Sequence, residues 1–64
     1  MNNSTIQRIV GEYMTEWAAR NITLSEEQRR TSLQQLVQQR LGQNVSSHVI
    51  RRAIARHRRV VNPP

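Results

Sequence analysis

Arginine is the residue of this 64-residue chain with the clearest capacity to bind a ligand, and its distribution is uneven. Residues 33–64 contain six arginines and no acidic residue, whereas the four arginines of residues 1–32 are balanced by four glutamates. The formal net charge of +6 therefore lies entirely in the second half. Because a guanidinium group makes paired hydrogen bonds to phosphate and to guanine edges, this distribution predicts a surface that faces a polyanion.

Most of these arginines share one side of a helix predicted at residues 47–60. Its apolar residues recur at the spacing of a single helix face, and they are Val49, Ile50, Ala53, Ile54, Val60 and Val61. Five arginines occupy the opposite arc, namely Arg51, Arg52, Arg56, Arg58 and Arg59. His48 and Ala55 lie in the middle of that arc, and the small Ala55 lets the helix axis sink toward a groove.

Position along this helix separates two kinds of contact. A helix in the major groove reads bases mainly with its N-terminal residues, while other basic side chains hold phosphates. The candidates for contact with base edges are Ser47, His48, Arg51 and Arg52. The candidates for contact with phosphates are Arg40, Arg56, Arg58 and Arg59.

A first helix is predicted at about residues 5–20, from apolar residues at helical spacing. The stripe, which we assign to the core and to a dimer interface, consists of Ile6, Ile9, Val10, Tyr13, Met14 and Trp17. Ser4 and Gln7 have the spacing of a capping box, and Asn21 suits the left-handed conformation that ends helices. Gly11 flanks the stripe, which indicates that another helix approaches closely there.

A second helix is predicted at residues 26–41. Ser25 and Gln28 form a capping-box pair at its start, and Gly42 is a natural stop. Its inner face consists of Leu33, Leu36, Val37 and Leu41. Glu26 favours the positive end of the helix dipole and is placed to pair with Arg30 one turn later.

The stretch from Leu33 to Ile54 resembles a helix-turn-helix motif. An aliphatic residue precedes Gly42, which opens the turn, and Ser46 caps a basic second helix. The turn is about one or two residues longer than in the tight form of the motif, and Gln38 stands where that form usually has a small residue. The resemblance implies a DNA-binding domain that places its second helix in the major groove.

These elements predict an all-α, three-helix domain spanning residues 1–64, with residues 33–60 as its basic, helix-turn-helix-like half. So small a chain without cysteine has neither a disulfide nor a thiolate metal site to reinforce its core, and self-association is the common remedy. We therefore expect a homodimer that shares the stripe of the first helix. No secretion signal or bilayer-spanning apolar run is visible, which favours a cytoplasmic location.

The residue types exclude some functions and leave three open. Without aspartate there is no Ser/His/Asp set, and the two histidines, His48 and His57, lie about half a helix circumference apart, so we expect no enzyme, cofactor or metal. His57, Tyr13 and Trp17 are interpreted as packing residues. The favoured function is a small DNA-binding regulator that is a homodimer. The alternatives are a helical dimeric adaptor for an acidic protein and an arginine-rich RNA binder, while membrane association is disfavoured.

Overall fold

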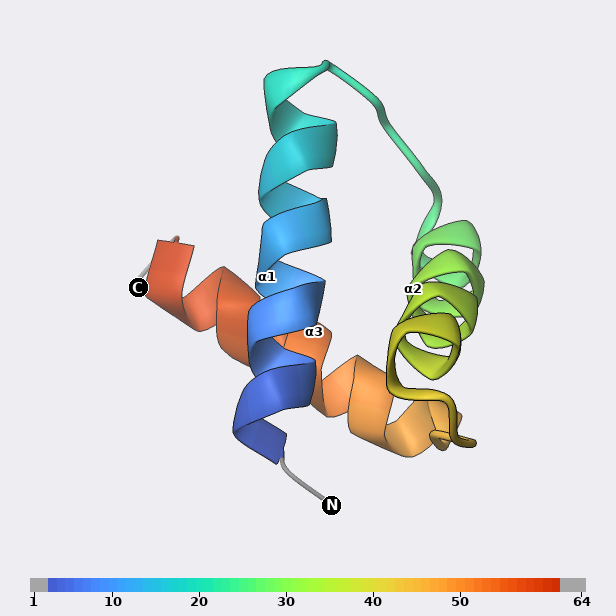
Figure 1. Cartoon of the computed structure of the whole chain (residues 1–64). Coiled ribbons are helices and arrows are strands. Elements are labelled where there is room, and N and C mark those ends of the chain that lie inside the picture. The colour runs from blue at the N-terminus through green and yellow to red at the C-terminus, as the bar shows by residue number, and fades with distance from the viewer. Residues whose placement is uncertain (1–2, 62–64) are drawn as a thin grey trace.

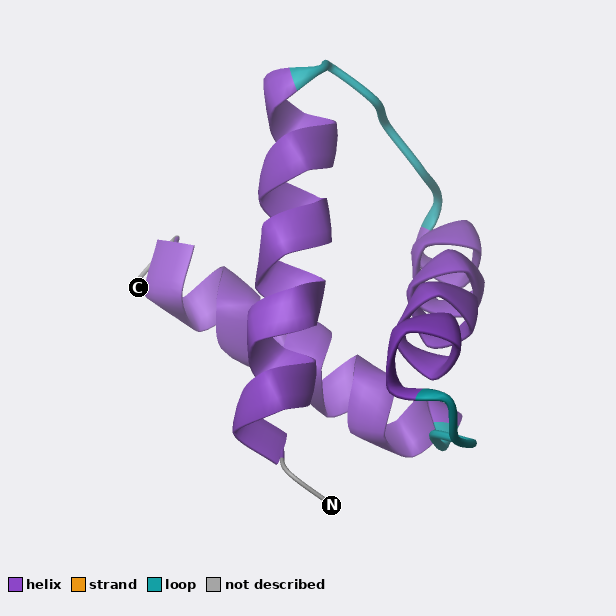
Figure 2. Cartoon of the chain, in the orientation of Figure 1, coloured by secondary structure: helices purple, strands orange, loops and turns teal. Residues whose placement is uncertain are grey.

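The computed structural model of the chain describes residues 3–61 and confirms the three helices. They are α1 (Asn3–Ala19), α2 (Glu26–Leu41) and α3 (Ser47–Val61). In Figure 1, α3 passes behind α1 and its N-terminal part lies below α2, so α3 contacts both other helices. Figure 2 shows only helices and their connecting loops in the described part of the chain. The all-α prediction is therefore confirmed.

The core lies where the three helices meet. Nine residues are at most 8% exposed, and they are Ile6, Ile9, Val10, Leu33, Val37, Val45, Ile50, Ala53 and Ile54. Every helix contributes one apolar stripe, as the spacing of these residues predicts. Burying these stripes against one another is the main force that holds the helices together.

The start of α1 differs from the predicted one. The helix already begins at Asn3, so Ser4 lies inside it and the predicted cap at Ser4 is wrong. The side chain of Gln7 instead crosses to α3, where Nε2 donates a hydrogen bond to the Ala53 carbonyl oxygen at 2.9 Å. A contact between residues 46 positions apart cannot be read from local spacing.

The end of α1 is a Schellman motif. Asn21 adopts the predicted left-handed conformation, with φ of 59°. The N–H of Ile22 donates to the Trp17 carbonyl at 2.8 Å, and that of Asn21 donates to the Ala18 carbonyl at 3.2 Å. These two bonds satisfy carbonyls that the helix end would otherwise leave unpaired.

The predicted capping box at the start of α2 is confirmed. The N–H of Gln28 donates to Ser25 Oγ at 3.2 Å, and the N–H of Ser25 donates to Gln28 Oε1 at 3.1 Å. Both bonds satisfy donors that the first turn of a helix leaves unpaired. The capping box therefore fixes where the loop ends and α2 begins.

Gly11 and His57 mark the place where α1 crosses α3. A Cβ atom on Gly11 would lie 3.3 Å from Nδ1 of His57, which is tighter than ordinary van der Waals contact. The two helices approach closely here because Gly11 has no side chain. The interpretations of Gly11 as a close-approach site and of His57 as a packing residue are both confirmed.

The connection between α2 and α3 is held by side chains of α2. Gly42 has the expected positive φ of 68°, and its N–H donates to the Gln38 carbonyl at 2.8 Å. The N–H of Val45 donates to Gln38 Oε1 at 3.0 Å, and the Val45 carbonyl accepts from Gln34 Nε2 at 2.8 Å. Gln38 therefore occupies its position because its side chain secures this longer turn. Ser46 then accepts the N–H of Val49 at 3.3 Å as the cap of α3.

Candidate nucleic-acid interface

The side of α3 that faces away from the core carries the predicted basic arc. Its exposed residues are His48, Arg51, Arg52, Ala55, Arg56, Arg58 and Arg59. Ser47, at the first turn, is half-buried. The structure therefore brings the four base-edge candidates and three of the four phosphate candidates onto one helix, with Ala55 between two rows of arginine.

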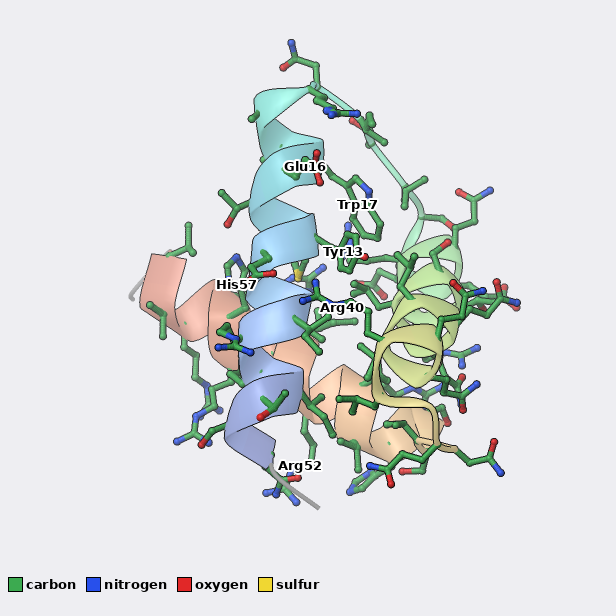
Figure 3. All side chains as sticks on the ribbon, in the orientation of Figure 1. Tyr13, Glu16, Trp17, Arg40, Arg52 and His57 are labelled. Carbon is green, nitrogen blue, oxygen red and sulfur yellow. The ribbon has the colours of Figure 1, made fainter. Side chains whose placement is uncertain are left out.

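One row faces α1 across a groove of about 1000 Å³. The charged side chains that line this groove are Arg8 from α1 and Arg52, Arg56 and Arg59 from α3. No acidic residue lines it among the described residues. Figure 3 shows Arg52 at the lower end of the molecule, close to the start of α1. This side of α3 therefore gathers four arginines from two helices and no acidic residue.

The other row faces the start of α2 across a smaller groove of about 470 Å³. Arg51 and Arg58 line it from α3, and Arg29 and Arg30 line it from α2 together with Glu26 and Glu27. Arg58 Nη1 lies 3.7 Å from Glu26 Oε1, so Glu26 pairs across helices and not with Arg30 as expected. The carboxylates neutralise part of the charge on this side.

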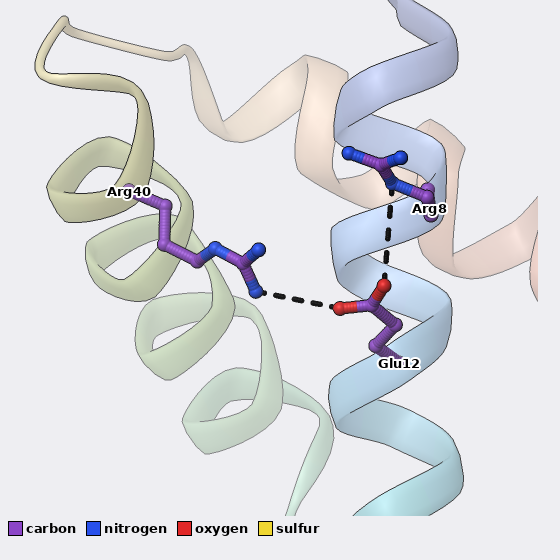
Figure 4. A network of polar contacts seen from close by, with 3 residues as sticks. All are labelled: Arg8, Glu12 and Arg40. Atoms are coloured by element: carbon purple, nitrogen blue, oxygen red, sulfur yellow. Dashed lines mark hydrogen bonds and ion pairs between the residues drawn. The ribbon is translucent and has the colours of Figure 1, made fainter.

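Arg40 lies apart from the other phosphate candidates. Its Nη1 lies 3.3 Å from Glu12 Oε2, and Arg8 Nε lies 4.0 Å from the other oxygen of the same carboxylate (Figure 4). Neither of the two grooves that the α3 arginines line includes Arg40. Its position between α1 and α2 makes it a link between these helices (Figure 3).

Arg8 is the member of this surface that the sequence analysis missed. It lies in the half of the chain where the numbers of arginines and glutamates are equal, so the charge distribution did not indicate Arg8 as a binding residue. The signal that identifies it is its spacing of three residues from Gly11, which places both on one side of α1. Because Gly11 marks the approach of α3, Arg8 lies beside α3 as well.

The apolar stripe of α1 is divided between the core and the surface. Ile6, Ile9 and Val10 are at most 1% exposed, which leaves them unavailable to a second chain. The remaining stripe residues, Tyr13, Met14 and Trp17, are half-buried, and the rings of Tyr13 and Trp17 lie 6.2 Å apart. Only the C-terminal half of this stripe is therefore accessible to a second chain in a dimer.

The last turn of α3 departs from its predicted burial. Val60 is 77% exposed and Val61 is 56% exposed, although both fall on the apolar side of the helix. In Figure 1 this end of α3 projects beyond α1, so no element covers it. Val61 lines a hollow together with Met14, Trp17, Ile22 and Leu24. An exposed apolar surface thus lies at the end of the molecule where α1 ends.

Residues 3–61 contain no helix long and apolar enough to cross a membrane. In the same part of the chain, no three histidine or glutamate side chains gather as metal ligands. Comparison of the chain with protein-family models, with curated proteins and with solved structures finds no match.

Proposed function

We propose that this protein is a small DNA-binding regulator that inserts α3 into the major groove of duplex DNA. The observation that carries the proposal is the groove between α1 and α3, where four arginines from two helices meet with no acidic residue in its lining. Arginine is favoured at phosphate and guanine contacts because its fork of donors matches both. A surface of this kind supplies the sequence-independent part of DNA affinity.

The arrangement of α3 supports insertion into a groove. Its first two turns present His48, Arg51 and Arg52 on an exposed face, where a groove-reading helix makes base contacts. Ala55 follows on the same face and adds little bulk. The turn that Gln38 holds fixes α3 relative to α2, and a fixed helix can present side chains in one register.

A competition experiment distinguishes binding to duplex DNA from binding to any polyanion. The protein is titrated into a fluorescein-labelled, random-sequence duplex while anisotropy is recorded at several NaCl concentrations. We expect log K to fall linearly with log [NaCl], with a slope near −0.9 for each phosphate neutralised. Polyglutamate and an RNA hairpin of matched charge serve as competitors, and we expect the duplex to be preferred over both.

If the protein prefers polyglutamate and binds the duplex weakly and independently of salt, the hypothesis of an adaptor for an acidic protein is favoured. If it prefers the hairpin, the hypothesis of an RNA binder is favoured. Either result contradicts the proposal. Arg20→Ala provides a matched control because Arg20 pairs with Glu16 at 2.9 Å on α1 and lines neither arginine-rich groove.

We also propose that the regulator is a homodimer formed at the apolar end of the molecule. Ile22 is 43% exposed there, beside the half-buried Trp17 and the exposed Val61. A second copy is the occupant that suits this surface, because Trp17, Ile22 and Val61 gather there and Arg20 is neutralised by Glu16. Arg29 and Arg58 also line this hollow, and both are shared with the α2 groove. Two copies joined in this way bury their apolar ends and keep the groove between α1 and α3 of each copy open to DNA.

A further inference from the structure

We propose that α1, and not the start of α2, is the second element that holds the DNA backbone, with Arg8 as its phosphate ligand. This inference rests on the proposed function and assigns the partner of one groove. In a helix-turn-helix, the first helix of the motif crosses the backbone while the second enters the major groove. Here the two grooves beside α3 differ in charge, and the difference points to α1.

The groove along α2 is less suited to a phosphate strand than the groove along α1. Glu26 and Glu27 stand in its lining, and Glu26 already lies 3.7 Å from Arg58. A phosphate brought to this place meets two carboxylates of its own sign, which offset two of the four arginines that line the groove. Because like charges placed together across an interface are unfavourable, this side of α3 attracts the backbone less than the other side does, where four arginines line the groove without an acidic residue.

The groove along α1 has four arginines as well, but no acidic residue lines it. Arg52, Arg56 and Arg59 follow one another at intervals of four and three residues, so they form a row along one side of α3. With a rise of about 1.5 Å per residue, the row extends over roughly 10 Å of helix axis. Arg56 and Arg59 of this row are phosphate candidates, and Arg52 at its N-terminal end is a base-edge candidate, so the row leads from the bases to the backbone.

Arg8 completes this groove from the opposite wall. Its ion pair with Glu12 is long, at 4.0 Å, and the two side chains are 67% and 53% exposed. Exposed pairs of this kind contribute little, about 0 to 1 kcal/mol. Glu12 lies closer to Arg40, at 3.3 Å, which engages the carboxylate from the far side. Arg8 can therefore exchange Glu12 for a phosphate, to which arginine makes shorter, charge-assisted bonds.

The first turn of α1 adds to the positive electrostatic potential in the groove between α1 and α3. Asn3 and Ser4 also line the groove, so the positive end of the α1 dipole lies at its border. This contribution is secondary to the four guanidinium groups, but it has the same sign. The α1 groove thus combines a helix start with four arginines and no acidic residue, whereas Glu26 and Glu27 stand at the helix start beside the α2 groove.

The test compares Arg8→Ala with Arg30→Ala on the random-sequence duplex. Arg30 lines the opposing groove on α2 and is the matched control for a contact made by α2. We expect Arg8→Ala to lower the magnitude of the salt slope by about 0.9, the value for one phosphate, and Arg8→Lys to restore it. Arg30→Ala should leave the slope unchanged. Circular dichroism and thermal unfolding establish that every variant keeps the helical fold.

The outcomes separate this inference from the proposed function. If the parent binds the duplex with a steep slope and Arg30→Ala lowers that slope while Arg8→Ala does not, α2 holds the backbone and the inference is overturned alone. An unchanged slope in both variants overturns it as well, because no phosphate then lies at Arg8. If the parent itself binds no duplex, the proposed function and the inference fail together.

Discussion

Gln38 and Val45 are joined by a hydrogen bond in which the Val45 N–H donates to Gln38 Oε1 at 3.0 Å. Val45 is 2% exposed, so its N–H has no access to water as an alternative acceptor. The bond connects the last turn of α2 to the residue just before the cap of α3. It therefore helps to set the angle at which α3 leaves the turn, and with it the position of the arginine face.

Replacing Gln38 with alanine should destabilise the domain. Loss of the acceptor leaves the buried Val45 N–H unpaired, which costs about 1–3 kcal/mol in the free energy of unfolding. Gln39→Ala is the control, because Gln39 is an exposed neighbour on the same helix. Urea denaturation followed by circular dichroism measures both. Equal stability of the two variants would show that the turn does not depend on the Gln38 side chain.

Gly42→Ala should destabilise the domain by about 1 kcal/mol or more, because an L residue is strained at positive φ. No atom lies within 4 Å of a Cβ added at Gly42, so the effect comes from the backbone alone. Gly42→Asn should be milder, since asparagine tolerates this conformation better. A Gly42→Ala variant as stable as the parent would contradict the left-handed turn.

Gly11 and His57 should show coupled effects on stability. Alanine in a helix interior is favoured over glycine by about 1 kcal/mol, but on Gly11 the new Cβ presses against His57 Nδ1. Gly11→Ala should therefore stabilise the His57→Ala variant more than it stabilises the parent. A double-mutant cycle in urea measures this difference. Additive effects would mean that the helices are not in contact at this crossing.

Local signals in the sequence located most of the helix ends, although the predicted cap at Ser4 is wrong. Asn21, Ser25 and Gly42 each act on backbone groups within a few residues, so their roles follow from spacing alone. Contacts between helices could not be predicted in this way. The pairing of Glu26 with Arg58 and the place of Arg8 beside α3 both depend on how the helices cross.

The same limit applies to burial. Val60 and Val61 lie on the apolar side of α3, yet they are exposed because the helix extends past its neighbour. Periodicity identifies the side of a helix that faces the core, but it does not give the length over which a partner helix covers it. The exposed arginine face of α3 was predictable because the side of a helix that faces away from the core follows from periodicity alone, whatever helix covers the other side.

The proposed dimer is tested by sedimentation. At micromolar concentration we expect a species of twice the 7.5 kDa chain mass. Ile22→Glu should shift it to the monomer, because the new carboxylate would be buried against its counterpart in the second copy. Thr15→Glu, at an exposed position of α1, is the control. A single 7.5 kDa species in the parent would contradict the dimer.

Arg52 and Arg59 should contribute to DNA binding in different ways. At a preferred site, found by selection from a random duplex pool, Arg52→Ala should weaken binding by about 1–3 kcal/mol and flatten the sequence preference. Arg59→Ala should weaken all sequences alike and reduce the magnitude of the salt slope by about one. Both side chains are exposed, so neither variant should unfold. Identical profiles for the two variants would contradict the division between base and phosphate contacts.

The most direct test of the central claim, that the exposed face of α3 binds duplex DNA, is an NMR titration of the ¹⁵N-labelled protein with a short duplex. We expect the largest backbone amide shifts at residues 48–59 of α3 and at the first turns of α1, with little change at residues 20–24. Arg20 and Ile22, in that loop, provide the internal reference because they line neither arginine-rich groove. Shifts concentrated at residues 20–24, or no shifts at duplex concentrations that saturate the anisotropy signal, would contradict the account.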